Sequence, residues 1–399
     1  MIEENTFLRK VYRLKENPFT DRSGVGPTGY FVGRQQQQET WTKVVDGRKG
    51  SRGSSLNFIV GDYGYGKTYS LWMILQQYKD DPGILGVYIK LLREDLTPKF
   101  GVDFIQRIFT VVDVDRIDVA RAKKALLKLP EVLKQQASVV AKWLDGDELA
   151  KSFVSGKEQL KAADLSKLGL RQNIKSTDVA REYLVIFLYA LKESGTPTLL
   201  LCVDEVEYLF SQMRGAKVAN VINALRAIYD IPTSPEVRVL GLDVANIVFF
   251  FGISQSGWTN LNDLEKREQT QGGPIQATFS RRQSLIELGP LSREETEKLI
   301  ERRLSYNRAE KRFEKEPLIP YTKDFVDYIY QLTLGNPREI VERCDYTLED
   351  GLELRIPKLT CAFARKVFES HGLTVEPGRA PALEKAQARP RRRRSPSRA

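Results

Sequence analysis

The feature that most constrains the fold of this chain is a glycine-rich loop at residues 61–68. Its sequence is Gly-Asp-Tyr-Gly-Tyr-Gly-Lys-Thr. In this pattern the glycines let backbone N–H groups surround phosphate oxygens, the lysine neutralises phosphate charge, and the threonine hydroxyl is a Mg²⁺ ligand. A strand must lead into such a loop and a helix must follow it, because the helix N-terminus adds positive potential. The loop therefore predicts a nucleotide-binding α/β domain.

The sequence on each side of the loop supplies both elements. Residues 56–60 form a short apolar run, and residues 67–79 carry apolar side chains at helical spacing. The residues predicted to bind the nucleotide here are Gly61, Asp62, Tyr63, Gly64, Tyr65, Gly66, Lys67, Thr68 and Tyr69.

Four more apolar runs predict further strands, at residues 84–91, 199–203, 246–253 and 285–288. A helix is predicted to follow the last of these from Ser292, which forms a capping-box pattern with Glu295. Apolar strands that alternate with helices imply a parallel sheet covered on both faces. Ligands of such sheets bind at the carboxyl ends of the strands. The glycine-rich loop lies at one of these ends, so we expect the chemistry at this edge.

Two carboxylates follow one buried strand. Residues 198–205 read Thr-Leu-Leu-Leu-Cys-Val-Asp-Glu. Beside a phosphate loop, Asp204 is predicted to hold Mg²⁺ directly or through water, together with Thr68, and Glu205 to activate the attacking water as general base. The alternative is an ordinary strand that ends in solvated acids.

Further polar residues are candidates for catalysis. Gln255, or else Ser254, follows the strand 246–253 and could orient the attacking water. Arg338 follows Asn336 and Pro337, which suit a helix cap and first turn, so its side chain would project near a helix start and could reach a phosphate. The alternatives are a plain strand terminus and a surface arginine.

Two arginines precede the last predicted strand. Arg281 and Arg282 are placed where a guanidinium could reach a neighbouring subunit's nucleotide and stabilise transition-state charge. The alternative is a solvated basic turn.

Composition argues against several classes of function. The 399 residues allow two or three domains, no apolar run reaches transmembrane length, and the N-terminus lacks a signal-peptide pattern. Three scattered cysteines and a single histidine, His371, argue against a zinc site or a histidine-based triad. We expect a cytoplasmic protein with no membrane partner.

The net charge of +10 is unevenly distributed. Residues 376–399 carry eight basic side chains against two acidic ones, in a segment rich in proline and alanine that is predicted to be disordered. Such a tail can bind nucleic acid without sequence selectivity. A nuclear localisation run and a solubilising tail are the alternatives.

Helical residues 110–175 mix basic and acidic side chains and are expected to present a solvated face. A partner-binding or DNA-binding arm is the alternative.

Taken in chain order, these elements resemble an AAA+ ATPase of the origin-recognition and replication-initiator clade, over about residues 15–370. The resemblance identifies residues 61–68 with Walker A, Asp204 and Glu205 with Walker B, Gln255 with sensor 1, Arg338 with sensor 2, and Arg281 or Arg282 with the arginine finger. Residues 31–34, Phe-Val-Gly-Arg, resemble the segment that packs near adenine, which implies that Val32 and Arg34 help to bind the nucleotide.

A narrower likeness exists to ATP-binding proteins of BREX-type phage-defence systems. It rests on Trp-Leu-Asp-Gly at 143–146 and Asn-Ala-Leu-Arg-Ala-Ile-Tyr-Asp at 223–230.

Two features of the chain depart from the initiator pattern. The short segment after the lid leaves no expectation of a winged-helix domain, and Gln255, one methylene longer, stands where the sensor residue of this clade is usually asparagine.

The resemblance implies a specific organisation. We expect a segment near adenine at residues 1–50, an α/β core with a five-stranded parallel sheet at 51–305 including the insertion at 110–175, a helical lid at 306–372 and the basic tail at 373–399. ATP and Mg²⁺ would bind between core and lid. The expected function is ATP hydrolysis coupled to homo-oligomerisation, acting on DNA as a loader, remodeller or regulator with a further protein partner. The alternative is a nucleotide-dependent switch in a defence or signalling assembly with protein partners.

Overall fold

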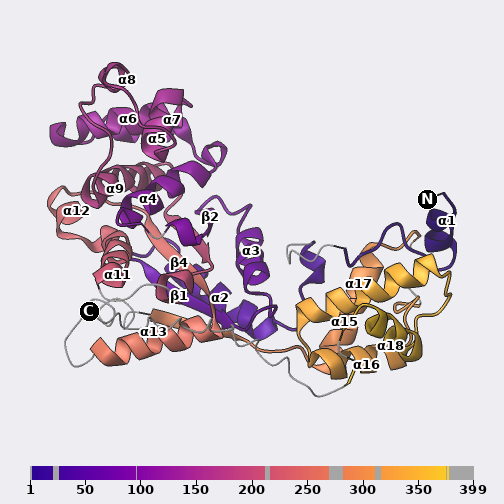
Figure 1. Ribbon diagram of the computed structural model, residues 1–399. Coiled ribbons are helices and arrows are strands. Elements are labelled where there is room, and N and C mark those ends of the chain that lie inside the picture. The colour runs from indigo at the N-terminus through magenta and orange to yellow at the C-terminus, as the bar shows by residue number, and fades with distance from the viewer. Residues whose placement is uncertain are drawn as a thin grey trace, which may run out of the picture. The chain divides into compact units, whose positions relative to one another are not determined.

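The structure is a computed structural model of the 399-residue chain (Figure 1). It describes residues 2–20, 27–95, 97–211, 216–268, 282–310, 316–373 and 375–376. The chain divides into two units. The sheet unit is Ser23–Gly289, and the helical unit combines Met1–Arg22 with Pro290–Ala399.

The sheet unit contains a five-stranded sheet in the order β2-β3-β4-β1-β5. Every neighbouring pair of strands is parallel, which confirms the predicted fold class. The strands are β1 (Ser55–Gly61), β2 (Ile84–Lys90), β3 (Thr198–Asp204), β4 (Asn246–Ser254) and β5 (Arg282–Leu288). Each of them overlaps a run that the sequence predicted.

β1, β3 and β4 are buried along almost their whole length because both faces of the sheet are covered. In β3, Leu199, Leu201 and Val203 belong to one hydrophobic cluster, whereas Leu200 and Cys202 belong to another. Successive side chains of a strand point to opposite faces, so each cluster marks one face of the sheet.

Different helices cover the two faces. The face with Leu200 and Cys202 packs against α2 (Gln35–Arg48) and α3 (Lys67–Gln77). The other face packs against α4 (Phe100–Val111), α9 (Thr177–Glu193) and α11 (Ala216–Tyr229). Figure 1 shows α3 on one side of the sheet and these three helices on the other. The shorter helices α10 (Tyr208–Ser211) and α12 (Pro235–Val239) and the longer α13 (Gln255–Glu268) complete the described helices of this layer.

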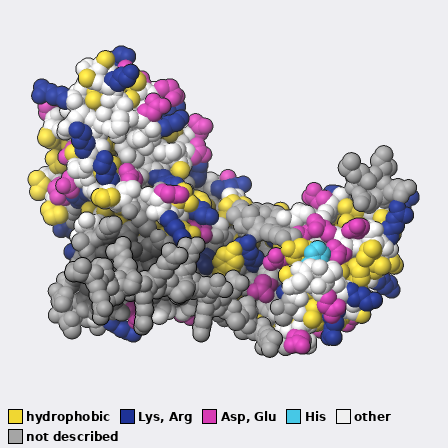
Figure 2. All heavy atoms as spheres, in the orientation of Figure 1, with side chains coloured by type: hydrophobic (Ala, Val, Ile, Leu, Met, Phe, Trp, Pro, Cys, Tyr) yellow, Lys and Arg dark blue, Asp and Glu magenta, His cyan; other side chains and the backbone are white. Residues whose placement is uncertain are grey.

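The predicted helical insertion extends the layer that contains α4 and α9. Its helices are α5 (Val119–Leu126), α6 (Lys134–Leu144), α7 (Glu148–Ser155) and α8 (Ala162–Lys167). The Trp143 ring packs edge-on against Phe109 and Phe187, with ring centroids 5.1 and 5.3 Å apart. Trp143 is therefore a core residue of this insertion. Basic and acidic side chains are interspersed over the face of these helices that Figure 2 shows, in keeping with a solvated surface.

The helical unit joins the start of the chain to its C-terminal helices. These are α1 (Ile2–Lys10), α15 (Arg293–Tyr306), α16 (Lys323–Thr333), α17 (Pro337–Glu353) and α18 (Cys361–Ser370). Tyr12 donates a 2.6 Å hydrogen bond to the carbonyl of Ile356, and Asn17 donates a 2.7 Å bond to Asp345. The first twenty residues thus pack with helices more than 300 positions later in the chain.

Both helix starts that the sequence predicted in this unit are present. Ser292 and Glu295 form the capping box of α15. The Asn336 side chain caps α17 by accepting from the backbone of Arg338 and Glu339, and Pro337 is the first residue of that helix. Among the described residues, no helix combines the length and apolar character needed to cross a bilayer.

Candidate nucleotide-binding site

The glycine-rich loop has the predicted strand–loop–helix arrangement. β1 ends at Gly61 and α3 begins at Lys67. Gly64 and Gly66 have φ values of +87° and +89°, which side-chain-bearing residues rarely adopt. A Cβ added at Gly61 would lie 3.0 Å from the carbonyl oxygen of Leu288 at the end of β5. The glycines therefore set the turn and its close packing against the neighbouring strand.

The lysine of the loop is held over the loop itself. Lys67 Nζ donates to the carbonyl oxygens of Gly61 and Asp62, at 3.0 and 3.2 Å. These contacts place the ammonium group within the curve of the loop, where it can neutralise phosphate charge.

The Thr68 hydroxyl and the Asp204 carboxylate meet directly. Thr68 Oγ1 of α3 donates to Asp204 Oδ2 at the end of β3, at 2.6 Å, although β4 lies between β3 and the strand that leads into the loop, β1. The same oxygen accepts from the Tyr88 hydroxyl at 3.0 Å, and Asp204 Oδ1 accepts from the Glu205 backbone at 3.0 Å. Asp204 is 2% exposed. Both of its oxygens are thus hydrogen-bonded in a buried position, as a buried carboxylate requires.

Gly252 makes room for this carboxylate. It lies in β4, between β1 and β3. A Cβ built at Gly252 would lie 2.7 Å from Asp204 Oδ1 and 3.0 Å from Leu71 Cδ1 of α3. A larger residue would therefore push against both Asp204 and the helix that follows the loop.

Glu205 has an unusual backbone and a perturbed carboxyl group. Its φ of +60° is in the left-handed region, where a residue with a side chain is strained. Burial, followed by the charges of Glu207 and Asp204, raises the pKa of the Glu205 carboxyl, and Lys90 and Lys67 oppose that rise. Lys90 Nζ of β2 lies 3.9 Å from Glu205 Oε1. The arrangement favours proton uptake by Glu205, which suits a general base.

The end of β4 brings Ser254 and Gln255 to the same edge of the sheet. Ser254 is the register partner of Gly61, directly beside the start of the loop. Its hydroxyl accepts from the backbone N–H of Gly257 at 3.1 Å and so stabilises the first turn of α13. Gln255 is the first residue of α13 and is exposed. Of these two residues, Gln255 is the better placed to reach a ligand.

The segment before α2 contacts the loop. Arg34 is 6% exposed, and its Nη2 donates to the carbonyl oxygens of Tyr65 and Gly289, at 3.3 and 2.6 Å. Tyr69 packs against Phe31, with ring centroids 5.4 Å apart. Val32 lies between these two contacts in the chain and is half-buried. The guanidinium of Arg34 thus positions the loop backbone.

The remaining predicted residues belong to the helical unit or lie wholly or partly outside the described residues. Arg338 is exposed in the first turn of α17, in the helical unit. Arg281 lies outside the described residues. Arg282 begins β5, and its side chain is not among those described. The basic residues of the tail, from Arg379 on, also lie outside the described residues.

Three residues of this edge were not predicted: Tyr88, Lys90 and Gly252. Tyr88 and Lys90 alternate along the end of β2, and the register pairs Lys90 with Asp204. Polar side chains at the end of an apolar strand were the pattern that identified Asp204, and the same criterion applied to β2 would have found them. No pattern in the sequence identified Gly252, since only the packing of three elements defines its role.

Comparisons with known proteins agree with this geometry. A family model described as "BREX system ATP-binding protein BrxC/D" matches residues 134–342. The ORC2 protein of Aeropyrum pernix, solved in its ADP form, has a TM-score of 0.51 at 13% identity, covering 89% of this chain and 73% of that chain. This similarity shows a shared fold.

Two further solved structures are more distant. Cdc6p of Pyrobaculum aerophilum has a TM-score of 0.45 at 15% identity, covering 88% of this chain and 71% of that one. The Walker-type ATPase PABY2304 of Pyrococcus abyssi has a TM-score of 0.45 at 14% identity, covering 86% and 74%. No curated protein matches the sequence significantly.

Proposed function

This chain belongs to the family of BREX system ATP-binding proteins BrxC/D, and from that premise we propose that it hydrolyses ATP and couples the nucleotide state to its assembly with other molecules. The observation that carries the proposal is the 2.6 Å contact between Thr68 and Asp204 beside the glycine-rich loop. This contact places a hydroxyl and a carboxylate oxygen together where the loop would hold the phosphates.

The donor set fits Mg²⁺. Thr68 and Asp204 supply hard oxygen ligands, which this ion prefers. Within the described residues, no group of three or more His, Cys, Asp or Glu is arranged to hold a metal, so the site suits an ion that phosphate oxygens and water also ligate. Bound there, Mg²⁺ would neutralise the charge that develops on the transferred phosphoryl group.

The chain's own residues divide the remaining tasks. Lys67 and the backbone N–H groups of residues 61–68 bind the phosphates. Glu205 accepts the proton of the attacking water, and Gln255 orients that water. Arg34 positions the loop through the carbonyl of Tyr65.

Three arginines extend the proposal to regulation. We assign Arg338 to sensing the γ-phosphate, and Arg281 or Arg282 to a neighbouring subunit's nucleotide, on the resemblance to AAA+ ATPases. Such an arrangement would make homo-oligomerisation depend on ATP. We further propose that the assembly acts on DNA as a loader, remodeller or regulator, together with a protein partner.

The chemistry is tested by two substitutions. Glu205→Gln should keep ATP binding and lose most turnover, whereas Lys67→Ala should lose both, as measured by fluorescent-nucleotide binding and phosphate release. Normal turnover by Glu205→Gln would refute the general-base assignment. Light scattering with and without a non-hydrolysable ATP analogue tests the assembly, and an unchanged mass would contradict it.

A second candidate function is a nucleotide-dependent switch with protein partners only. Family membership supports this candidate, because the family description names ATP binding within a BREX system. DNA binding discriminates between the two. If an ATP analogue promotes binding that weakens steeply with salt, the DNA-acting function is supported, and absence of binding in every nucleotide state supports the switch.

A further inference from the structure

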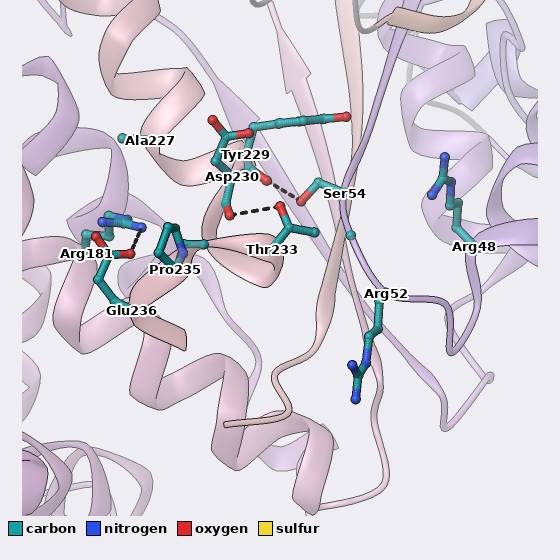
Figure 3. A pocket seen from close by; sticks show the side chains of 12 residues that line it. Arg48, Arg52, Ser54, Arg181, Ala227, Tyr229, Asp230, Thr233, Pro235 and Glu236 are labelled. Carbon is teal, nitrogen blue, oxygen red and sulfur yellow. Dashed lines mark hydrogen bonds and ion pairs between the residues drawn. The ribbon is translucent and has the colours of Figure 1, made fainter. Parts of the chain in front are cut away.

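A cavity lies near the start of β1, at the end of that strand opposite to the glycine-rich loop. It has a volume of about 690 Å³, within the range of ligand pockets (Figure 3). Ser54, which immediately precedes β1, is among its lining residues, whereas the glycine-rich loop follows the other end of that strand. The cavity is therefore separate from the candidate nucleotide-binding site.

Three arginines from separate elements line this cavity. Arg48 is the last residue of α2, Arg52 precedes β1, and Arg181 belongs to α9. Guanidinium groups match phosphate oxygens with paired N–H donors. A cavity of this size with three of them is suited to an anion.

Two of these guanidinium groups retain donor capacity. The Arg52 side chain is 83% exposed, and its closest contact to a carboxylate is 3.9 Å, to Asp243. Asp243 already pairs with Lys192 at 2.6 Å. Arg181 Nη2 donates to Glu236 at 3.1 Å, but its Nε is buried and has no partner among the described residues. A buried donor without a partner indicates a missing ligand or water.

The acidic residues of the cavity are already neutralised. Glu236 pairs with Arg181, and Asp230 pairs with Arg226 at 3.4 Å. The Thr233 hydroxyl donates to the Asp230 carbonyl, and its oxygen can also accept a hydrogen bond. The lining thus combines cationic donors with an acceptor that suits a hydroxyl group of a sugar.

Small residues keep the cavity open. Gly53 has a φ of +97°, and a Cβ there would lie 3.4 Å from Thr233 Cγ2. Ala227 adds only a methyl group to the lining. Figure 3 shows Arg181 directed toward Glu236 and Arg52 extending from the strand's lead-in segment.

We propose that this cavity binds a sugar phosphate, with Arg52 and Arg181 donating to the phosphate and the Thr233 hydroxyl accepting from the sugar. The group could come from a nucleic-acid strand or from a free nucleotide. The first source rests on the DNA partner proposed above, and the second does not.

The test uses the full chain with the Lys67→Ala change, which disables the glycine-rich loop and so removes ATP binding and hydrolysis from the result. Arg52→Glu is compared with Arg171→Glu, an equal charge change at an exposed residue of the insertion. The probes are a fluorescein-labelled ten-nucleotide oligothymidylate, followed by anisotropy, and AMP, followed by calorimetry. Unchanged melting temperatures confirm that both variants fold.

We expect Arg52→Glu to weaken the binding of at least one of the two probes tenfold or more. Arg171→Glu should change the affinity for either probe less than twofold. If the oligonucleotide is the probe affected, the salt dependence of its log K should also become less steep, by about 0.7 for each phosphate that the protein no longer neutralises. Selective loss of oligonucleotide binding identifies a strand as the source, and selective loss of AMP binding identifies a free nucleotide.

If Arg52→Glu loses the binding of both probes, the result supports recognition of the sugar phosphate that the two probes share. Equal effects of the two substitutions, or no binding of either probe, would overturn the proposal. It is also overturned if truncation after Val375 abolishes oligonucleotide binding while Arg52→Glu leaves both probes unaffected. In that case the basic tail, and not the cavity, binds the strand.

Discussion

Tyr88 donates a 3.0 Å hydrogen bond to Oδ2 of Asp204, the oxygen that also accepts from Thr68. Burial, and then the charge of Asp204, raises the pKa of Tyr88, so the hydroxyl stays protonated and remains a donor. The tyrosine thus fixes the orientation of a buried carboxylate from the strand next to it.

Tyr88→Phe removes this donor. We expect a loss of about 1.5–3 kcal/mol in the free energy of unfolding, because a hydrogen bond to a buried carboxylate is removed. Affinity for ATP with Mg²⁺ should fall while affinity for ATP without the ion changes little. Urea denaturation and nucleotide titrations measure both. Tyr189→Phe, at a half-buried tyrosine of α9, is the matched control; equal effects of the two changes would contradict the positioning role.

Gly252→Ala should disturb Asp204 and α3 together. The added methyl group would clash with Asp204 Oδ1 and Leu71, and overpacking of this kind costs about 1–3 kcal/mol. We expect a lower denaturation midpoint and weaker nucleotide binding. Gly47→Ala, in helix α2 where a Cβ meets nothing within 4 Å, should be neutral or stabilising. A Gly252→Ala protein as stable as the parent would show that the site relaxes without cost.

Glu205→Gln should change stability in a pH-dependent manner. The folded state raises the pKa of this carboxyl above its ordinary value near 4.5. As pH rises through that value the unfolded chain ionises first, so the carboxyl lowers stability above its folded pKa and has no such effect below its ordinary pKa. The substitution should therefore raise the melting temperature at pH 7 but not at pH 3.5. Exposed Glu158→Gln controls for the loss of one charge, and a gain that is the same at both pH values would be incompatible with this account.

Lys90→Ala should raise the pKa of Glu205 further, because the charge of Lys90 lowers that pKa more than the charge of Lys67 does. If Glu205 is the general base, the acid limb of the pH–rate profile for ATP hydrolysis should move to higher pH. Lys128→Ala, at an exposed lysine of the insertion, should leave the profile unchanged. A profile that does not move with Lys90→Ala would separate Glu205 from the rate-limiting proton transfer.

Arg34→Ala should loosen the glycine-rich loop. It removes donors to the carbonyls of Tyr65 and Gly289, and the loss of such buried charged hydrogen bonds costs about 1.5–3 kcal/mol. We expect weaker nucleotide binding together with lower stability, and partial recovery with Arg34→Lys. Calorimetric titration with ATP and thermal melting measure these effects, for which Arg171→Ala is the control. Unaltered ATP affinity would show that the loop keeps its shape without this residue.

Local sequence predicted those parts of the site that depend on neighbouring residues. The glycines of residues 61–68, the helix cap at Asn336 and the capping box at Ser292 are short-range patterns, and each was found where expected. The central strands β1, β3 and β4 were predicted because each is an apolar run buried on both faces, whereas the edge strand β5 buries only the face with Ile286 and Leu288.

Long-range partners could not be predicted in the same way. Nothing near Tyr12 or Asn17 in the sequence indicates Ile356 or Asp345 as their partners. The contact between the Arg34 guanidinium and the carbonyl of Tyr65 in the loop was likewise not predicted.

The sequence by itself determined that this chain has a phosphate-binding loop, a buried strand ending in two acids, and a parallel α/β fold. These follow from residue type and periodicity, which act over a few positions. Only the tertiary structure decided that Thr68 and Tyr88 donate to the same oxygen of Asp204, Oδ2, and that a glycine at 252 leaves space for the other oxygen, Oδ1. Strand order and packing bring these residues together although they are far apart in the sequence. No pattern among neighbouring residues could therefore predict their contacts.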